Sequence, residues 1–282
     1  MPRIIQSTQI EQAILQAYHT FPFQIYPQVL RLVSDAMETE TEARTISILQ
    51  SILDNAQIAR DEKMVPCQDT GTQIFFIEIG REVLIEGGNL EQCINHTLSQ
   101  ASQENFLRAS IVHDPLFDRT NTGDNTPAVF HVKQVDGDRL RIRITQKGGG
   151  AENMSRLIML TPASGIDQIE EQLLRVVREA GSKACPPLII GIGIGGNFEI
   201  APLLAKEALI GDLLMPNPQP EYAALEQRLL QAVNETGIGP MGLGGKTTAL
   251  RVLIRTAPCH IASLPLAINL QCHSHKHTEI VL

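Results

Sequence analysis

The sequence predicts an α+β (mixed α/β) fold, with a helical N-terminal part followed by mixed sheets with covering helices, and candidate metal-site loops at strand ends. Two observations predict this class. Apolar residues recur at helical spacing through the first part of the chain, and later segments mix strand-like and helix-like patterns without a clean βαβ repeat. We expect a single domain over residues 1–282, helical at about 8–60 and mixed α/β at about 61–282.

The helical region ends near Pro66, which interrupts the apolar periodicity. The segment TQIFFIEIG (72–80) predicts a strand, and a helix is expected over about 90–109. The segments AVFHVKQV and RLRIRITQK flank an Asp-Gly-Asp turn and predict a β-hairpin. The second half predicts, in order, strand 156–162, helix 166–180, strand 186–193, helix 198–210, helix 223–235, strand 247–257 and strand 263–271.

Composition and charge argue against several classes of protein. The net charge is −8 and no basic stripe is present, which argues against nucleic acid or an anionic membrane as partner. The longest apolar run, 188–194, is far short of the roughly 20 residues that cross a bilayer, and the N-terminus turns polar too early for a secretory signal. Five scattered cysteines do not form a disulfide framework, so we expect a cytoplasmic protein with reduced thiols.

The glycine cluster GIGIGG (191–196) matches the dinucleotide-binding pattern GxGxxG, after a predicted strand and before a predicted helix. About 20 residues further on, the chain is a Pro/Asn loop, where a dinucleotide-binding domain needs a second strand ending in an acid. Close packing of a helix on a strand explains the glycines without any ligand. A loop whose N–H groups bind some other anionic group is a third interpretation.

Two further segments are rich in glycine. GPMGLGGKTT (239–248) imitates a phosphate-binding P-loop, but Pro240 replaces the first glycine and a strand follows where a helix is required. This segment is interpreted as a turn or as a loop that lines an active site. KGGGAEN (147–153) follows a predicted strand, and its three glycines cost backbone entropy. It is either a flexible turn or a place where backbone comes very close to another group.

The cysteines fall into two groups. Cys93 has helical spacing and is interpreted as a small buried hydrophobe. Cys67, Cys185, Cys259 and Cys272 lie in predicted loops, too far apart in sequence for a local metal-binding knuckle. They either converge on one metal centre, because strand ends cluster in space, or are unrelated thiols.

The C-terminal tail CHSHKHTEIVL places His273, His275 and His277 at alternate positions, on one face if the tail is extended. Such a face could recruit a metal ion. We favour a surface tail that meets a partner subunit.

Six segments, in this order, resemble the α subunit of class I fumarate hydratases, with L-tartrate dehydratase α subunits as close relatives: VPCQDTGT, NTGDNTPA, KGGGAEN, CPPLIIGIGIGGNFE, GIGPMGLGGKTT and HIASLPLAINLQC. The resemblance runs from about residue 10 to the end. It implies a hydro-lyase that reversibly hydrates fumarate to L-malate, a step of the tricarboxylic acid cycle, with L-tartrate dehydration as the alternative. It also implies an oxygen-sensitive [4Fe–4S] cluster held by only three cysteines.

Matched by motif, the cluster ligands would be Cys67, Cys185 and Cys272. Cys259 departs from the family pattern and competes with Cys272 for the third place. We favour Cys272 because it ends the AINLQC segment that matches the family's ligand motif. Three cysteines leave one iron with an open position, which can act as a Lewis acid on a substrate carboxylate and hydroxyl.

The resemblance implies further site residues. Asp69 and His260 would be catalytic, acting on substrate position and proton transfer. Arg108 would clamp a substrate carboxylate, Gly150 would offer backbone contact, and Gln68 would lie within reach of whatever binds the open iron. Outside the motif context, each of these side chains is typical of a solvated or hydrogen-bonded surface residue.

The sequence ends at Leu282, just past the third cysteine, whereas single-chain family members continue into a second domain. We therefore expect a separate β subunit that completes a shared active site for a dicarboxylate, within a larger oligomer. The isolated chain should have little or no activity. Two alternatives from other classes are a nucleotide-binding regulatory module built on GIGIGG and a non-catalytic scaffold that only binds a partner chain.

Overall fold

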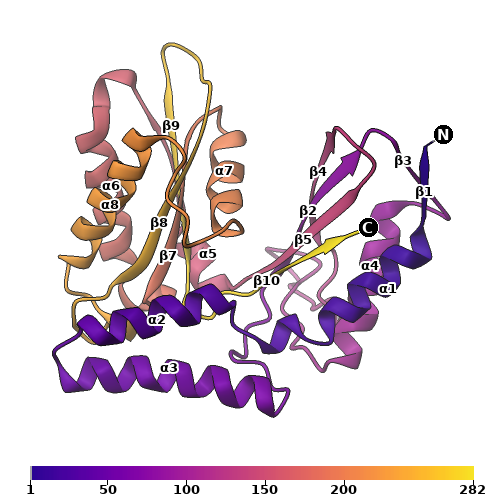
Figure 1. Cartoon of the computed structure of the whole chain (residues 1–282), viewed down its shortest axis with the longest axis horizontal. Helices are drawn as coiled ribbons and strands as arrows, with labels where there is room; N and C mark the ends of the chain where they lie inside the picture. The colour runs from indigo at the N-terminus through magenta and orange to yellow at the C-terminus, as the bar shows by residue number, and fades with distance from the viewer. Residues whose placement is uncertain (1) are drawn as a thin grey trace. The chain divides into compact units, whose positions relative to one another are not determined.

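The computed structural model describes residues 2–282, which form two compact units. Of the described residues, unit 1 comprises 2–25, Ile58–Gly149 and Lys276–Leu282, and unit 2 comprises Tyr26–Gln57 and Gly150–His275. The mixture of helices and mixed sheets confirms the predicted α+β class (Figure 1). The expected single domain, with the second family domain on another chain, stays a prediction.

The N-terminal region is helical, as predicted. Strand β1 (Arg3–Gln6) and helix α1 (Ser7–Tyr18) belong to unit 1, α2 (Pro27–Thr39) belongs to unit 2, and α3 (Ala43–Asp61) contains the boundary between the units. The N–H of Gln6 is bound by the side chain of Gln9 at 2.8 Å, which caps α1. Pro27 opens α2, where its missing N–H costs nothing.

The main sheet of unit 1 has the strand order β10-β5-β2-β4. Its strands are β2 (Thr72–Gly80), β4 (Val129–Val135), β5 (Leu140–Lys147) and β10 (His277–Val281), and β1 pairs in parallel with β3 (Val83–Glu86). Helices α1 and α4 (Leu90–Glu104) lie side by side (Figure 1). The core of unit 1 includes Ile10, Ile14, Tyr18, Phe75, Ile77, Ile94, Leu98, Ile142 and Ile144.

The predicted hairpin of β4 with β5 is wrong. Strand β2 lies between them, parallel to β4 and antiparallel to β5. The 136–139 turn closes around the end of β2, where the Gly80 N–H donates to the Arg139 carbonyl at 2.8 Å. Five consecutive residues of β2, Gln73 to Ile77, are buried, so this strand gains more from a central position than the edge would allow.

Helix α4 is shorter than the predicted 90–109. It ends at Glu104, and Asn105 donates from its side chain to the Ala101 carbonyl at 2.8 Å. Phe106 then adopts φ +52, a left-handed conformation that stops the helix. Arg108 therefore lies in the loop after the helix.

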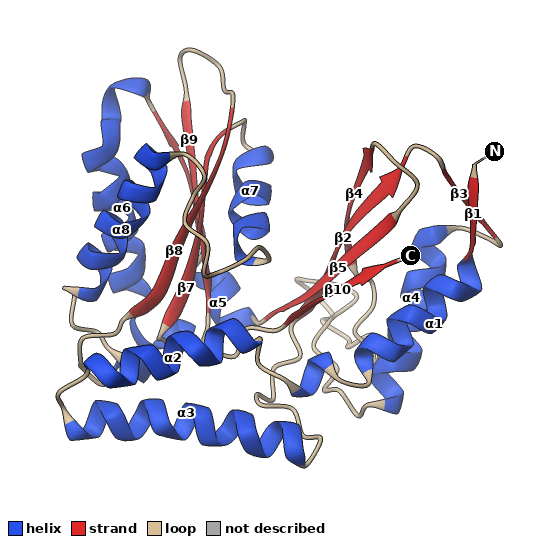
Figure 2. Ribbon diagram, in the orientation of Figure 1, coloured by secondary structure: helices blue, strands red, loops and turns tan. Residues whose placement is uncertain are grey.

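Unit 2 contains a sheet of order β6-β9-β7-β8 between two layers of helices (Figure 2). Its strands are β6 (Arg156–Leu160), β7 (Leu188–Gly195), β8 (Ala249–Ala257) and β9 (Leu264–Gln271). Helices α6 (Gly165–Ala180) and α8 (Pro220–Asn234) cover one face of the sheet, and their apolar residues form a hydrophobic core with its strands. Helix α7 (Ile200–Leu209) covers the other face. The remaining elements are α5 (Gly149–Met154) and the short 3₁₀ turns at Phe21–Phe23, Pro162–Ser164, Gly181–Ala184 and Pro240–Gly242.

Gly191 and Gly193 of the GIGIGG segment lie within β7, directly beneath α7. A Cβ atom at either position would collide with a backbone carbonyl of α7, at Ala205 and Ala201 respectively. The interpretation as close helix–strand packing is therefore confirmed for these two glycines.

Candidate functional site

The two units divide the predicted site residues between them. Cys67, Gln68, Asp69 and Arg108 belong to unit 1, and Gly150, Cys185, His260 and Cys272 belong to unit 2. The convergence of all three predicted cysteine ligands therefore stays a prediction.

In unit 1, Asp69 connects the Cys67 segment to the triple-glycine turn. One carboxylate oxygen accepts from the Gly71 N–H at 2.9 Å, and the other accepts from the Gly149 N–H at 2.8 Å. Gly71 adopts φ +69, and a Cβ there would lie 2.8 Å from the Gly148 nitrogen, so only glycine fits. Cys67 and Asp69 are half-buried, whereas Gln68 is exposed.

Arg108 lies on a loop that internal hydrogen bonds hold in shape. The buried Asn125 accepts from the Ser110 N–H at 2.8 Å and donates to the Ser102 hydroxyl at 3.3 Å. Asn121 donates to the Ala109 carbonyl at 3.0 Å. The NTGDN motif is thus the structural support of this loop. The Arg108 side chain is exposed and has no ion pair among the described residues, so it is available for an anionic ligand.

In unit 2, Cys185 has an unusual backbone. It adopts the left-handed conformation (φ 52, ψ 66) between the Gly181–Ala184 turn and two prolines that precede β7. Its N–H donates to the Ser182 carbonyl at 3.0 Å. A non-glycine residue in this region is held there by its surroundings, typically at a cost of about 1–3 kcal/mol.

The carbonyl of Cys185 is 3.0 Å from Nδ1 of His273. His273 directly follows Cys272, and Cys272 directly follows β9. This contact therefore brings the segments of two predicted ligands together. Burial lowers the pKa of His273, while its hydrogen bonds to backbone at Cys185 and Pro186 act in the opposite direction.

The surface tail predicted for residues 273–277 is wrong. His275 is 1% exposed, and its ring nitrogen Nδ1 lies 2.9 Å from the Gln271 amide. Beyond it, β10 pairs antiparallel with β5. His273 and His275 are held by hydrogen bonds within unit 2, and His277 begins β10, an edge strand of the unit 1 sheet. The sequence pattern alone did not reveal these contacts.

Gly150 begins the unit 2 part of α5. A Cβ atom at this position would lie 2.8 Å from the Lys183 carbonyl, two residues before Cys185. The absence of a side chain at Gly150 thus lets its backbone approach the segment before Cys185 closely. The flexible-turn interpretation does not account for this approach.

His260 and Cys259 lie in the exposed loop after β8. The Ala262 N–H donates to Nδ1 of His260 at 3.1 Å, which leaves Nε2 as the nitrogen that can carry or exchange a proton with a ligand. The Cys259 thiol donates to the Ser263 carbonyl at 3.3 Å within the same loop. His260 therefore has an oriented ring, and Cys259 has a partner of its own.

The thiols differ in character. Cys93 is buried, as predicted, and burial raises its pKa to about 12, which makes it an inert thiol. Cys67, Cys185 and Cys272 are half-buried and none forms a disulfide, so their donor chemistry suits an iron–sulfur cluster. Among residues 2–282, no three His, Cys, Asp or Glu side chains are grouped to hold a metal ion.

The segment GPMGLGGKTT (239–248), which resembles a P-loop in sequence, binds one of the chain's own carboxylates. The buried Glu40 accepts from the N–H groups of Lys246 and Thr247, both at 2.8 Å, and from the Thr247 hydroxyl at 3.0 Å. An internal carboxylate thus takes the N–H and hydroxyl donors of the GKTT sequence that a phosphate would need.

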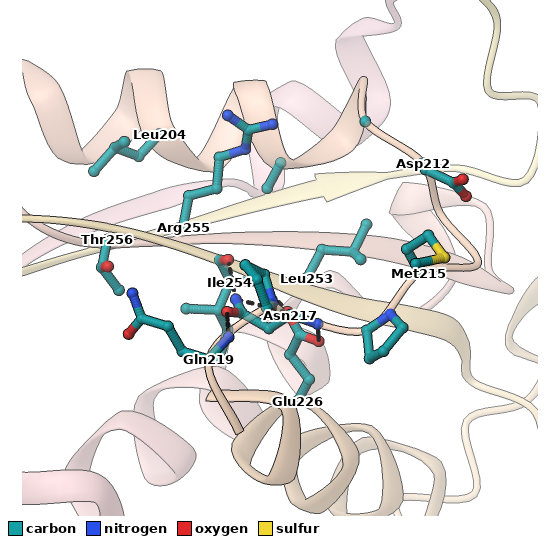
Figure 3. A pocket seen from close by; sticks show the side chains of 14 residues that line it. Leu204, Asp212, Met215, Asn217, Gln219, Glu226, Leu253, Ile254, Arg255 and Thr256 are labelled. Carbon is teal, nitrogen blue, oxygen red and sulfur yellow. Dashed lines mark hydrogen bonds between the residues drawn. The ribbon is translucent and has the colours of Figure 1, made fainter. Parts of the chain in front are cut away.

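A cavity of about 490 Å³ lies along the outer edge of β8 in unit 2, and none of the predicted site residues lines it (Figure 3). There Glu226 accepts from the Ile254 N–H at 2.8 Å, and Asn217 donates to the Ile254 carbonyl at 2.8 Å. These side chains satisfy peptide groups of β8, which is an edge strand of its sheet.

Comparison with known proteins identifies the family. The family model described as fumarate hydratase (Fumerase) matches residues 11–281. The chain belongs to the fumarate hydratase family. As a member it is a hydro-lyase, an enzyme that adds water across a carbon–carbon double bond or removes water to form one.

This fumarate hydratase family chain is similar to curated proteins over most of its length. One is a protein of Methanocaldococcus jannaschii whose name assigns it provisionally as an L(+)-tartrate dehydratase subunit alpha. It is 36% identical over 271 residues, or 95% of each chain. The L(+)-tartrate dehydratase subunit alpha of Escherichia coli (strain K12) is 30% identical over 251 residues, 87% of this chain and 81% of the relative. No helix within residues 2–282 is long and apolar enough to cross a membrane.

Proposed function

We propose that this chain is the α subunit of a fumarate hydratase, which adds water reversibly across the double bond of fumarate to give L-malate. The hydroxyl adds to one carbon and a proton to its neighbour, so the reaction needs no oxidant or reductant. The observation that best supports the proposal is the 3.0 Å contact of His273 with the Cys185 carbonyl, which ties two candidate ligand segments together.

Cys67, Cys185 and Cys272 would hold a [4Fe–4S] cluster in this proposal. When bound, such a cluster with only three cysteines supplies a Lewis-acidic iron for a substrate carboxylate and hydroxyl. Each cysteine of a cube binds a different iron atom, so these three need not meet as the ligands of a single ion would. Their separation in sequence and their half-burial agree with this role.

The other residues of the chain would bind and orient the substrate. The Arg108 guanidinium, which forms no ion pair within residues 2–282, would bind one carboxylate in a bidentate manner. Nε2 of His260 would hold or move a proton at the substrate, since Nδ1 is already bound by Ala262. Asp69 would take part in proton transfer at the substrate and would also orient the Gly149–Gly150 backbone, with Gln68 as a neighbouring polar contact.

A separate β subunit would complete the site in the cytoplasm. The relatives named above are described as subunit alpha, which supports a second chain. A dianion also needs more cationic groups than Arg108 provides. Hydration should appear only when both chains are present, and full turnover by this chain alone would contradict the shared site.

Tartrate dehydration is the second candidate, favoured by the names of the curated relatives. The substrates differ by one hydroxyl group, which a pocket distinguishes by about 1–3 kcal/mol when shape alone decides. The test is an anaerobic assay of the co-expressed pair, with L-malate and L-tartrate each followed by loss of substrate. We expect the larger kcat/KM with L-malate. A larger value with tartrate would replace the first proposal by the second.

A further inference from the structure

The ring of His273 makes a hydrogen bond that neither the family assignment of the chain nor the sequence pattern explains. His273 lies between Cys272 and the buried Ser274, and its ring reaches across to the Cys185 carbonyl, 88 positions away in the sequence. A carbonyl oxygen only accepts hydrogen bonds, so Nδ1 carries the hydrogen and donates it. One donor thus connects two chain segments that both carry a candidate cluster ligand.

Cys185 has an unfavourable backbone conformation, so hydrogen bonds from neighbouring segments matter more for it than for a residue in a favoured conformation. Its left-handed backbone is unfavourable for a side chain with a Cβ atom, and Pro186 and Pro187 after it have no N–H to donate. On the amino side the Cys185 N–H is bound to Ser182, and further on the Pro186 carbonyl accepts from Met241 at 2.8 Å. The Cys185 carbonyl between them is bound by His273.

We propose that His273 is a positioning residue that holds the Cys185 and Cys272 segments in the geometry that an iron–sulfur cluster requires. The inference rests on the proposed function, because it assumes that both cysteines bind the cluster. His273 would contact neither the iron nor the substrate and would act through the Cys185 backbone. Hydrogen-bonding partners behind metal ligands commonly change metal affinity by about 10- to 100-fold.

The experiment compares two substitutions that place a donor at different distances. In His273→Asn the amide nitrogen lies the same number of bonds from Cα as Nδ1, so the donor to Cys185 is kept. In His273→Gln the amide nitrogen lies one bond further out, and His273→Leu has no donor. The exposed His96, on α4 of unit 1, supplies the control His96→Asn.

Each variant of the full chain is reconstituted anaerobically with iron and sulfide, and the rate of iron loss to a ferrous chelator is measured. We expect about 10- to 100-fold faster loss in His273→Gln and His273→Leu than in wild type. His273→Asn should stay within about threefold of wild type, and His96→Asn should match it. The electron paramagnetic resonance spectrum of the oxidised cluster should change in the Gln variant and not in the Asn variant.

Several outcomes overturn the inference. Wild-type rates in all three His273 variants would show that the contact does not position the ligands. A second outcome is that the rate of iron loss in the variants correlates only with the thermal stability of the cluster-free chains, while the electron paramagnetic resonance spectrum is unchanged. That outcome would show that His273 has a general packing role instead. If His273→Leu does not fold, the Asn and Gln pair still decides. A wild-type chain that takes up no iron and sulfide would instead overturn the proposed function, and this inference with it.

Discussion

The Asp69 carboxylate accepts the Gly149 N–H at 2.8 Å with one oxygen and the Gly71 N–H at 2.9 Å with the other. This side chain therefore ties the segment after Cys67 to the triple-glycine turn. A carboxylate that accepts two backbone N–H groups is a structural support, and the same charge could also serve a substrate. The two roles predict different effects of mutation.

We expect Asp69→Asn to keep the fold and lose activity. The amide oxygen still accepts one N–H, so the free energy of unfolding should fall by only about 1 kcal/mol, whereas Asp69→Ala should cost about 1–3 kcal/mol. A proton-transfer role predicts a fall in kcat of about 10²- to 10⁴-fold in Asp69→Asn. Urea unfolding and anaerobic assay of the pair with its β subunit measure both. A near-normal kcat in Asp69→Asn would contradict the proton-transfer role and would show that Asp69 has only a structural role.

Arg108→Lys should weaken substrate binding without affecting the fold. The side chain is exposed and forms no ion pair with another described residue, and lysine cannot reproduce the bidentate contact of a guanidinium with a carboxylate. We expect KM for malate to rise about tenfold or more, with thermal stability unchanged. Arg139→Lys, on the exposed turn between β4 and β5, is the matched control. An unchanged KM in Arg108→Lys would remove Arg108 from the substrate site.

Gly193→Ala should destabilise the chain because of packing. The added Cβ would meet the Ala201 carbonyl of α7, and overpacking of this kind costs about 1–3 kcal/mol. At Gly211 an added Cβ would be 3.7 Å from its nearest neighbour, an ordinary contact, so Gly211→Ala should change stability by less than about 0.5 kcal/mol. Urea unfolding measures both. Equal stabilities would contradict the packing account of GIGIGG.

The free energy of unfolding should fall in mild acid because of His277. Burial, and secondly the charge of Arg143, lower the pKa of His277 to about 4 from its ordinary value of 6.5. Between these values the unfolded chain binds a proton that the folded chain does not. Stability is therefore lost as the pH falls through this window, by up to about 1.4 kcal/mol per pH unit from this group.

The substitution His277→Gln removes this titration and should flatten the dependence, measured by urea unfolding at several pH values from about 7 to about 5. The exposed His96→Gln is the control and should keep the wild-type slope. An unchanged slope in His277→Gln would show that His277 is not the source. His273, whose pKa burial also lowers, contributes in the same direction and should leave a residual slope.

The sequence predicts well the elements that local periodicity determines. Strand β2 has the predicted bounds, 72–80, and α6 begins one residue before its predicted start, because runs of Ile and Phe or a regular apolar stripe determine these elements locally. The family motifs likewise indicate Cys67, Cys185 and Cys272 from the sequence alone. The roles of these residues in binding a cluster remain predictions.

Sequence patterns do not predict which strands and side chains pair when they lie far apart in the chain. The hairpin prediction failed because β2 enters between β4 and β5, a choice that depends on burial of the whole sheet. Glu40 fills the loop at Lys246 from 206 positions away, and no local pattern connects them. The alternating pattern around His273 predicts an exposed tail. The sequence does not show that the His273 ring has a hydrogen-bond partner in the distant Cys185 carbonyl.

Iron and sulfide analysis after anaerobic reconstitution decides whether three thiolates of this chain share one cluster. Single Ser substitutions of Cys67, Cys185 and Cys272 are compared with Cys259→Ser and wild type. We expect four irons and four sulfides per chain in wild type and Cys259→Ser, and loss of most of both in each of the other three variants. Wild-type iron in Cys67→Ser or Cys185→Ser would contradict it. Loss of iron in Cys259→Ser with retention in Cys272→Ser would move the third ligand to Cys259.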